Sequence, residues 1–284
     1  MGVSKVGIVG SGIMGSGICE VAAAAGSLVV VRSRTETSAR GLVAGLEKQL
    51  ARQVEKGKRT AEEADAIRER VSATTAIEDL ADCDLVIESV VEDLAVKKDL
   101  FTEMDRLVKD EAILATNTST LPVVEMAVHT SRPDRVCGVH FFNPAGVMSV
   151  VEVVRPLTAS DETIATVTEW VTNCGKEVVL VKDQAGFVVN ALLFPYLNNA
   201  IRMLESGVAS LEAIDTAMKG ACGFPMGPFA LLDLVGLDTS LAILTALYDE
   251  AADPNYAPVP LLRRMVAAGK LGRKSGHGFY DYRR

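Results

Sequence analysis

A doubly wound α/β domain followed by an all-helical domain is the fold class that this sequence predicts. Three observations support it. A glycine-rich turn separates a short β-branched run from an alanine-rich segment near the start of the chain. Strand-like apolar runs then alternate with helical patterns, and the strand-like runs stop near Asp183. Beyond that residue only helical patterns follow.

The first elements form a βαβ unit with a helical excursion after it. The run Lys5–Gly10 predicts a strand, and Ile13–Ala25 predicts a helix. Leu28–Arg32 predicts the second strand, after a short return that contains glycine. The next segment, Thr37–Arg70, is charged and broken at Gly57, so we expect a pair of helices that projects from the sheet.

The remaining elements fall into two blocks, which set the domain boundary. Further strands are expected at Val71–Thr74, Asp84–Glu88, Ile113–Thr116, Val136–His140, Val150–Val154 and Val178–Val181. Helices are expected at Val188–Glu205, Leu211–Ala221, Phe229–Leu234, Thr239–Ala251 and Leu261–Ala268. We therefore expect a first domain over residues 1–183 and a second over residues 184–284. Small helical domains often bury part of their surface in a dimer, so we expect a homodimer.

The composition predicts a globular protein and argues against several kinds of partner. The chain has 284 residues, of which 49% are apolar, and a net charge of -8 with acids and bases interspersed. We therefore expect no nucleic-acid partner. The longest apolar run, Val21–Val31, is too short to span a membrane, and we identify no signal peptide. The five cysteines are scattered without a C-x-x-C pair, which indicates a reducing cytoplasm and no structural metal.

The turn after the first strand has the pattern G-x-G-x-x-G. Its residues are Gly10, Ser11, Gly12, Ile13, Met14 and Gly15. In such a turn the first glycine permits the tight bend, the second lets the backbone approach a pyrophosphate, and the third lets the helix pack on the strand. The helix N-terminus also favours an anion. A purely structural glycine turn is the alternative, but strand, glycines, helix and second strand coincide and favour a Rossmann-type dinucleotide site.

The end of the second strand bears on the choice of dinucleotide. An NAD site normally has an acidic residue there for the ribose 2′-hydroxyl, whereas this chain has Arg32, Ser33 and Arg34. Two guanidinium groups beside a hydroxyl suit a 2′-phosphate, so we predict NADP(H) as the preferred cofactor, with NAD(H) possible. In the alternative, both arginines are solvated or pair with Glu36.

One histidine and one glutamate are candidates for proton transfer. His140 closes an apolar strand, and ligands of open α/β sheets bind beyond the carboxyl ends of strands. A histidine serves as acid or base at neutral pH. Glu152 is a charged residue inside an apolar run, and a carboxylate bound to the imidazole would orient it. In the alternative, His140 is a satisfied core residue and Glu152 faces water. His129 and His277 lie in polar or glycine-flanked loops, and we expect them at the surface.

Several motifs, in order along the whole chain, resemble those of the short-chain 3-hydroxyacyl-CoA dehydrogenases, with the bacterial 3-hydroxybutyryl-CoA dehydrogenases as the nearest group. Besides the glycine turn, they are Asn117-Thr-Ser119, His140-Phe-Phe-Asn-Pro144, Val151-Glu-Val153, Gly186-Phe-Val-Val-Asn190, Pro225-Met-Gly-Pro228 and Gly272-Arg-Lys-Ser-Gly-His-Gly-Phe-Tyr280. The resemblance implies hydride transfer between a nicotinamide and C3 of an acyl thioester, with His140 and Glu152 as a catalytic dyad.

The resemblance also implies roles for further residues. Ser119 and Asn190 would hold the substrate 3-oxygen and thioester. Contacts to the cofactor would come from Glu92, Lys97, Asn117, Ser119, Asn143 and Lys274. Arg52 and Lys56 lie where the family has basic residues that grip the phosphorylated adenosine of coenzyme A. As alternatives, Ser119 and Asn143 are turn formers, and Lys97 and Lys274 are solvated charges.

Two departures from the family pattern bear on specificity. Ser33 replaces the usual acid, and the segment Asn143-Pro-Ala-Gly146-Val-Met-Ser149 stands where many relatives have a second proline and a lysine. The expected reaction is the interconversion of 3-hydroxybutyryl-CoA and acetoacetyl-CoA. The same chemistry on an acyl-carrier-protein thioester, in the biosynthesis of an extender unit, is the alternative substrate. A 3-hydroxyisobutyrate-type dehydrogenase is disfavoured because the helix after Gly186 lacks a suitably placed lysine. A non-catalytic dinucleotide sensor is the alternative outside enzymes.

Overall fold

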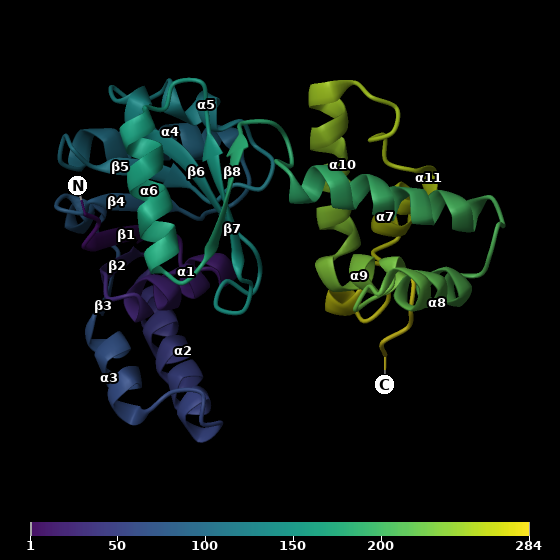
Figure 1. Cartoon of the computed structure of the whole chain (residues 1–284), viewed down its shortest axis with the longest axis horizontal. Helices are drawn as coiled ribbons and strands as arrows, with labels where there is room; N and C mark the ends of the chain where they lie inside the picture. Colours follow the sequence, from purple (N-terminus) through teal and green to yellow (C-terminus); the bar gives the residue numbers. More distant parts are fainter. Residues whose placement is uncertain (1, 284) are drawn as a thin grey trace. The chain divides into compact units, whose positions relative to one another are not determined.

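The structure is a computed structural model that describes residues 2–283, and it divides the chain into two compact units. The first unit is Met1–Asp183 and the second is Gln184–Arg284 (Figure 1). The first contains every strand of the sheet, and the second is helical. The fold class predicted from the sequence is confirmed.

The first unit is built on an eight-stranded sheet in the order β3-β2-β1-β4-β5-β6-β7-β8. The strands are β1 (Lys5–Val9), β2 (Leu28–Arg32), β3 (Val71–Thr74), β4 (Leu85–Glu88), β5 (Ile113–Thr116), β6 (Val136–Phe141), β7 (Val150–Arg155) and β8 (Glu177–Lys182). Neighbouring strands are parallel, except that β6 and β7 are antiparallel. Residues 142–149 between them are too few for a parallel crossover.

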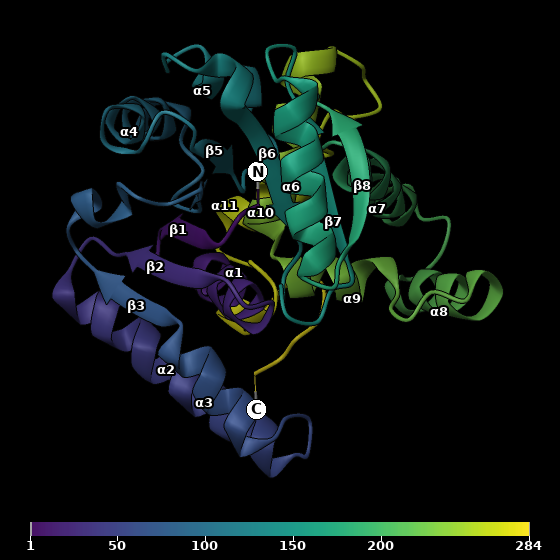
Figure 2. The ribbon, with the colours of Figure 1, turned by 60° about the vertical axis from the view of Figure 1, so that its left-hand side comes forward.

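Helices cover both faces of this sheet. Those of the first unit are α1 (Ile13–Ala24), α2 (Glu36–Glu55), α3 (Ala61–Glu69), α4 (Leu94–Leu107), α5 (Val123–Ala127) and α6 (Asp161–Asn173), with short 3-10 turns η1 (Ile77–Leu80) and η2 (Pro133–Arg135). Helices α1 and α6 pack on one face, and α4 and α5 lie on the other (Figure 2). As the charge pattern predicts, α2 and α3 form a pair that extends beyond the sheet.

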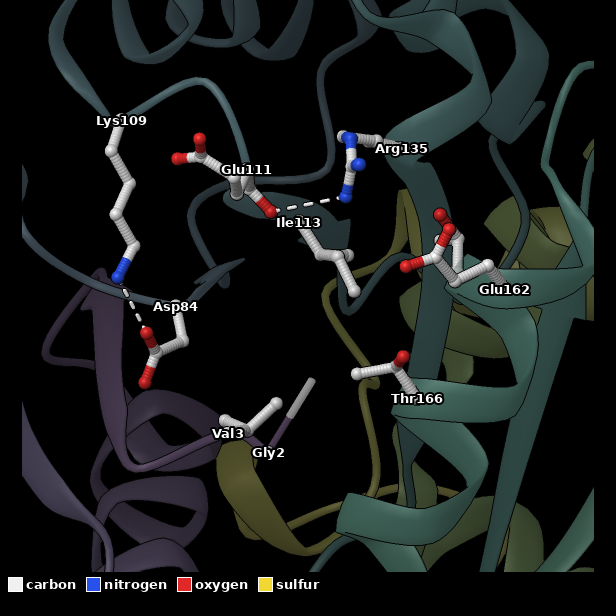
Figure 3. Close-up of a pocket in the computed structure, with 10 residues that line it drawn as sticks. Gly2, Val3, Asp84, Lys109, Glu111, Ile113, Arg135, Glu162 and Thr166 are labelled. Atoms are coloured by element: carbon white, nitrogen blue, oxygen red, sulfur yellow. Dashed lines mark hydrogen bonds and ion pairs between the residues drawn. The ribbon is translucent and has the colours of Figure 1, made fainter.

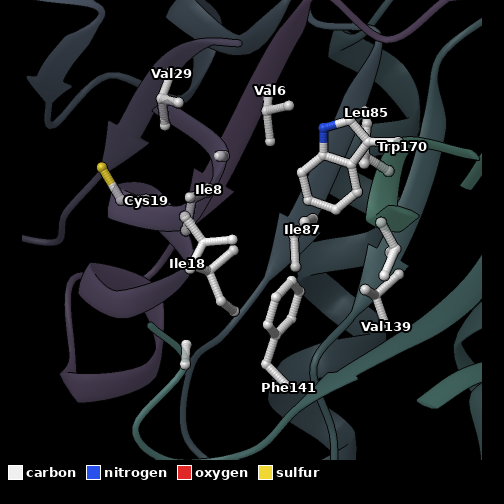
Figure 4. Close-up of a cluster of buried hydrophobic side chains, with 14 of the residues drawn as sticks. Val6, Ile8, Ile18, Cys19, Val29, Leu85, Ile87, Val139, Phe141 and Trp170 are labelled. Atoms are coloured by element: carbon white, nitrogen blue, oxygen red, sulfur yellow. The ribbon is translucent and has the colours of Figure 1, made fainter. Parts of the chain in front are cut away.

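The core between the sheet and α1 and α6 fixes the carboxyl ends of the strands. Ile8, Ile18 and Ile87 are fully buried there, and the ring of Phe141 meets that of Trp170 edge-on at 6.5 Å between centroids (Figure 4). Close packing of this kind leaves little freedom to move one strand against another. Residues that follow the strands are therefore held at defined positions along one edge of the sheet.

The second unit has its own apolar core. Its helices are α7 (Val189–Glu205), α8 (Leu211–Cys222), α9 (Pro228–Val235), α10 (Leu237–Ala251) and α11 (Pro260–Ala267), with the 3-10 turn η3 (Arg273–Ser275). Buried side chains such as Leu197, Phe229 and Leu244 hold these helices together. Within residues 2–283 no single helix is long and apolar enough to cross a membrane. Helices α9 and α10 have the required length and composition only when they are taken together, and the chain bends by 96° between them.

Two buried aspartates fasten the C-terminal segment of the second unit. Asp215 accepts hydrogen bonds from the Phe229 amide and the Tyr280 hydroxyl, at 2.8 and 2.9 Å. Asp233 accepts from the amides of Phe279 and Tyr280, at 2.9 and 2.8 Å. These bonds satisfy two carboxylates that are almost completely removed from water.

Candidate active site

The glycine turn lies between β1 and the N-terminus of α1, and its geometry leaves room for a pyrophosphate. Gly10 has a φ of +116°, and a Cβ there would stand 2.3 Å from the Ser89 carbonyl oxygen. A Cβ on Gly15 would lie 1.9 Å from the Gly10 carbonyl oxygen. A Cβ on Gly12 would meet no atom within 4 Å, and the first turn of α1 has no acidic residue. The first and third glycines are thus required by the fold, while the second faces open space at a helix N-terminus that favours an anion.

The neighbouring turn at the end of β2 carries the residues predicted to select the dinucleotide. Ser33 is 1% exposed, its amide donates to the Thr74 carbonyl at 2.8 Å, and its hydroxyl has no hydrogen-bond partner. Nε of half-buried Arg32 is likewise buried without a partner, and Arg34 is exposed. Glu36 accepts a bond from the Thr75 hydroxyl at 3.2 Å, and no ion pair to Arg32 or Arg34 is found within residues 2–283.

The predicted histidine–glutamate pair is formed by strand register. Because β6 and β7 are antiparallel, His140 stands directly opposite Glu152. Nδ1 of His140 lies 2.7 Å from Oε2 of Glu152, and the two side chains are 5% and 0% exposed. The ring of Phe142 meets the imidazole edge-on at 4.6 Å. A buried carboxylate on Nδ1 fixes the orientation of the ring and leaves Nε2 for chemistry.

Ser119 meets the other nitrogen of this imidazole. Its Oγ lies 3.2 Å from Nε2 of His140. Glu92 holds the turn that carries Ser119, because its Oε1 accepts from the Thr118 hydroxyl at 2.5 Å and from the Ser119 amide at 2.9 Å. Glu152, His140 and Ser119 therefore form one line of polar contacts. The pairing of His140 with Glu152 was expected from the sequence, whereas the contact between Ser119 and His140 was not stated there.

A second buried pair lies next to this turn. Nζ of Lys97, 1% exposed, is 2.7 and 2.8 Å from the two carboxylate oxygens of Glu88, which is fully buried, and 3.3 Å from Glu92. Lys97 is thus enclosed by carboxylates and is not a solvated charge. Glu88 was missed in the sequence, although an acidic residue that ends an apolar strand is the same kind of signal that identified Glu152.

Two asparagines predicted to contact the cofactor lie near the dyad in the chain. Oδ1 of Asn117 accepts the Phe141 amide at 2.9 Å, which ties the turn after β5 to β6. Asn143 is exposed and precedes Pro144 through a cis peptide bond.

The strand that carries His140 also holds Cys137, which is fully buried. Burial raises the pKa of its thiol to about 12, so it stays uncharged.

The other predicted residues belong to the second unit or to α2. Asn190, 8% exposed on α7, and Lys274, which pairs with Asp238 at 2.5 Å, belong to the second unit. Arg52 and Lys56 are exposed at the end of α2, one helical turn apart. Lys48, one further turn back, is also exposed, so the three basic residues share a helix face; the i, i+4 spacing was the signal that could have added Lys48.

Two family models together match almost the whole chain. Residues 5–184 match the family model of the 3-hydroxyacyl-CoA dehydrogenase NAD binding domain, and residues 186–282 match that of the 3-hydroxyacyl-CoA dehydrogenase C-terminal domain. The chain belongs to the 3-hydroxyacyl-CoA dehydrogenase family. The resemblance noted in the sequence is therefore confirmed.

Full-length relatives within this family include bacterial and mitochondrial proteins. A 3-hydroxybutyryl-CoA dehydrogenase of Mycobacterium tuberculosis is 48% identical over 285 residues, covering 99% of each chain. The human mitochondrial hydroxyacyl-coenzyme A dehydrogenase is 43% identical, covering 99% of this chain and 92% of its own. The crystal structure of (S)-3-hydroxybutyryl-CoA dehydrogenase from Ralstonia eutropha has a TM-score of 0.97 at 42% identity, covering 99% of this chain and 100% of that one. A 3-hydroxyisobutyrate dehydrogenase from Salmonella typhimurium, at 16% identity and a TM-score of 0.62, shares the fold alone.

Proposed function

We propose that the protein is an oxidoreductase that interconverts 3-hydroxyacyl-CoA and 3-ketoacyl-CoA, with 3-hydroxybutyryl-CoA and acetoacetyl-CoA as the expected pair. The observation that carries the proposal is the line of contacts from Glu152 through His140 to Ser119. The names of the bacterial relatives support the choice of substrate.

The chemistry follows from what each side chain can do. A bound nicotinamide supplies or accepts the hydride. His140 gives a proton from Nε2 to the 3-oxygen during reduction and takes it back during oxidation. Glu152 stabilises the imidazolium through Nδ1. Ser119, beside Nε2, donates to the oxygen as negative charge develops on it, and Asn190 keeps the role that the family resemblance gives it, as a second donor to the substrate.

We propose NADP(H) as the preferred cofactor. The buried hydroxyl of Ser33 and Nε of Arg32 are polar groups without a partner at the turn where an acid would exclude a 2′-phosphate. Exposed Arg34 adds a second guanidinium, and arginine forms strong paired hydrogen bonds with phosphate. Use of NAD(H) is the alternative, supported by the description of the matching family model.

We assign the exposed face of α2 to the adenosine phosphates of coenzyme A. Lys48, Arg52 and Lys56 follow each other at one-turn intervals. Replacing Arg52 and Lys56 with glutamine is expected to raise KM for acetoacetyl-CoA about tenfold while kcat changes little, because a uniform binding contact is lost. Replacing two exposed lysines of the second unit, Lys219 and Lys270, with glutamine is the control. An unchanged KM in the α2 variant would contradict this assignment.

We also propose a homodimer formed through the second unit. Leu192, Met203, Val208 and Phe224 are 72%, 43%, 64% and 42% exposed. These are large apolar side chains, and burying them between two copies of the chain would favour association. The mass in solution, measured by light scattering, is expected to be twice the 30.2 kDa of one chain; a single-chain mass would contradict the proposal.

We place the protein in the cytoplasm. All five cysteines are free, and Cys19, Cys83 and Cys137 are buried as thiols. Thiols that stay reduced are typical of a reducing compartment.

The function is tested by the loss of nicotinamide absorbance with acetoacetyl-CoA, measured separately with NADPH and with NADH. Rapid oxidation of NADPH over NADH is the expected result. The opposite preference would keep the dehydrogenase and reject the assignment of Ser33, Arg32 and Arg34. If neither cofactor is oxidised, the same assay with an acetoacetyl thioester of an acyl-carrier protein tests the alternative substrate, and failure there favours the non-catalytic sensor.

A further inference from the structure

Glu88 is a buried carboxylate to which the mechanism above gives no role. It ends β4 and is fully removed from water. Oε1 accepts the Val90 amide at 2.6 Å, and Oε2 accepts the Thr116 hydroxyl at 2.7 Å. Both oxygens also accept from the Lys97 ammonium. Burial of two charges carries a large desolvation penalty, so a pair of this depth calls for a reason beyond stability.

A chain of contacts leads from this pair to the dyad. Lys97 also faces Oε2 of Glu92 at 3.3 Å, while Oε1 of Glu92 accepts the Ser119 amide at 2.9 Å. The Ser119 hydroxyl in turn lies 3.2 Å from Nε2 of His140. The contacts thus run in sequence from Glu88 through Lys97, Glu92 and Ser119 to His140.

Glu88 also joins the two loops that border the site. Its bond to the Val90 amide shapes the turn that follows β4, and the Ser89 carbonyl of that turn is the atom that excludes a side chain at Gly10. The backbone carbonyl of Glu88 accepts the Asn117 amide at 2.8 Å, at the start of the turn that carries Ser119. Glu88 therefore contacts both the turn that packs against Gly10 and the turn that carries Ser119.

We propose that Glu88 is a positioning residue for the dehydrogenase reaction, acting through Lys97 and Glu92 to hold Ser119 against His140. The inference rests on the proposed function. Without the carboxylate of Glu88, the buried ammonium of Lys97 keeps Glu92 as its one anionic partner in this cluster and draws it away from the Ser119 amide. A displacement of about 1 Å in such a site can lower turnover about a hundredfold.

The test is a double-mutant cycle between Glu88→Gln and Ser119→Ala, with Asp105→Asn as the matched control. Asp105 lies on α4, the helix that carries Lys97, and forms a nearly buried pair with Arg132 at 2.7 Å while accepting the Ser131 amide at 2.7 Å. The control thus breaks an ion pair of the same helix away from Ser119. Turnover at saturating acetoacetyl-CoA and cofactor, Kd for the cofactor and Tm are measured for each protein.

Glu88→Gln is expected to lower kcat about tenfold to a hundredfold in the unaltered background. In the Ser119→Ala background the same change is expected to lower kcat by less than about threefold, because residues that act through one another are not additive. Asp105→Asn is expected to lower Tm and to leave kcat within about twofold in either background.

Equal losses of kcat from Glu88→Gln in both backgrounds would overturn the proposal, as would a lower Tm with unchanged kcat. Should Glu88→Gln fail to fold, Glu88→Asp keeps the charge but shortens the reach, and its loss of kcat is expected to vanish in Ser119→Ala in the same way; an additive loss would again overturn the proposal. Absence of turnover in the unaltered protein would instead reject the proposed function.

Discussion

The two ends of the parallel strands in the first unit carry charges in contrasting ways. At the carboxyl end, Glu88 and Lys97 are 0% and 1% exposed and stand beside a buried histidine–glutamate pair. At the amino end, Asp84 and Lys109 are 19% and 34% exposed and line a small pocket with Arg135 (Figure 3). Both ends hold ion pairs shorter than 3 Å, so the contrast lies in burial and in what the charges touch.

The partners explain the contrast. Asp84 accepts the amides of Ser4 and Lys5 at 2.7 and 2.8 Å and the Lys109 ammonium at 2.5 Å, which fastens the start of β1 to the segment before β4. The carboxyl-end charges, in contrast, converge on Ser119 and Nε2 of His140. The comparison indicates that charges at the amino end stabilise the fold and those at the carboxyl end position reacting groups.

The largest effect outside the histidine itself is expected from Glu152→Gln. The amide keeps the size of the side chain but removes the charge that stabilises the imidazolium, so kcat is expected to fall about a thousandfold while Kd for the cofactor is unchanged. Steady-state kinetics and fluorescence titration of the cofactor measure the two quantities. Turnover within tenfold of the unaltered protein would remove Glu152 from the mechanism and weaken the contrast between the two ends.

A smaller effect is expected at the cofactor turn, also at the carboxyl end. Ser33→Asp combined with Arg34→Gln is expected to shift the ratio of kcat/KM for NADPH over NADH by about tenfold to a hundredfold toward NADH. The new carboxylate would accept the ribose 2′-hydroxyl and repel a 2′-phosphate. Arg40→Gln, an exposed arginine on α2, is the control. An unshifted ratio would show that the 2′-phosphate is bound elsewhere.

The smallest effect on turnover is expected at the amino end. Asp84→Asn is expected to lower Tm by about 2–6 °C and to leave kcat unchanged, because it loses hydrogen bonds that only fasten strands. Burial raises the pKa of Asp84, but the Lys109 ammonium and the amides of Lys5 and Ser4 outweigh burial and hold the pKa below its ordinary value of 3.8.

This lowered pKa gives the sign of a pH dependence. Stability supplied by the ionised Asp84 is fully present above pH 3.8 and is lost as the pH falls through the lower pKa of the folded protein. The difference in Tm between the unaltered protein and Asp84→Asn is therefore expected to be constant near neutrality and to shrink as the pH falls below 3.8. A difference that grows on acidification would contradict the role given to Asp84.

Much of the first unit was predictable because its signals are local. The glycine turn, the β-branched runs and the break at Gly57 are visible within a few neighbouring residues, and each produced the expected element. The antiparallel direction of β7 was not stated in advance, although the short segment 142–149 requires it.

Without the family resemblance, the site was predictable where a single residue carries the signal. His140 and Glu152 are polar residues in apolar strands, and register then places them opposite each other. Lys97 has the pattern of a surface lysine on an amphipathic helix, and its burial depends on a strand nine residues earlier. Glu88 ends an apolar strand and so carries the same local signal as Glu152, but its partner Lys97 is not recognisable in the sequence.

The most direct test of the contrast measures turnover and Tm side by side for His140→Gln and Asp84→Asn. We expect His140→Gln to lower kcat about a thousandfold to ten-thousandfold and still to bind the cofactor, and we expect Asp84→Asn to lower Tm and to leave kcat intact. Retained turnover in His140→Gln, or an equal loss of turnover in Asp84→Asn, would contradict this expectation.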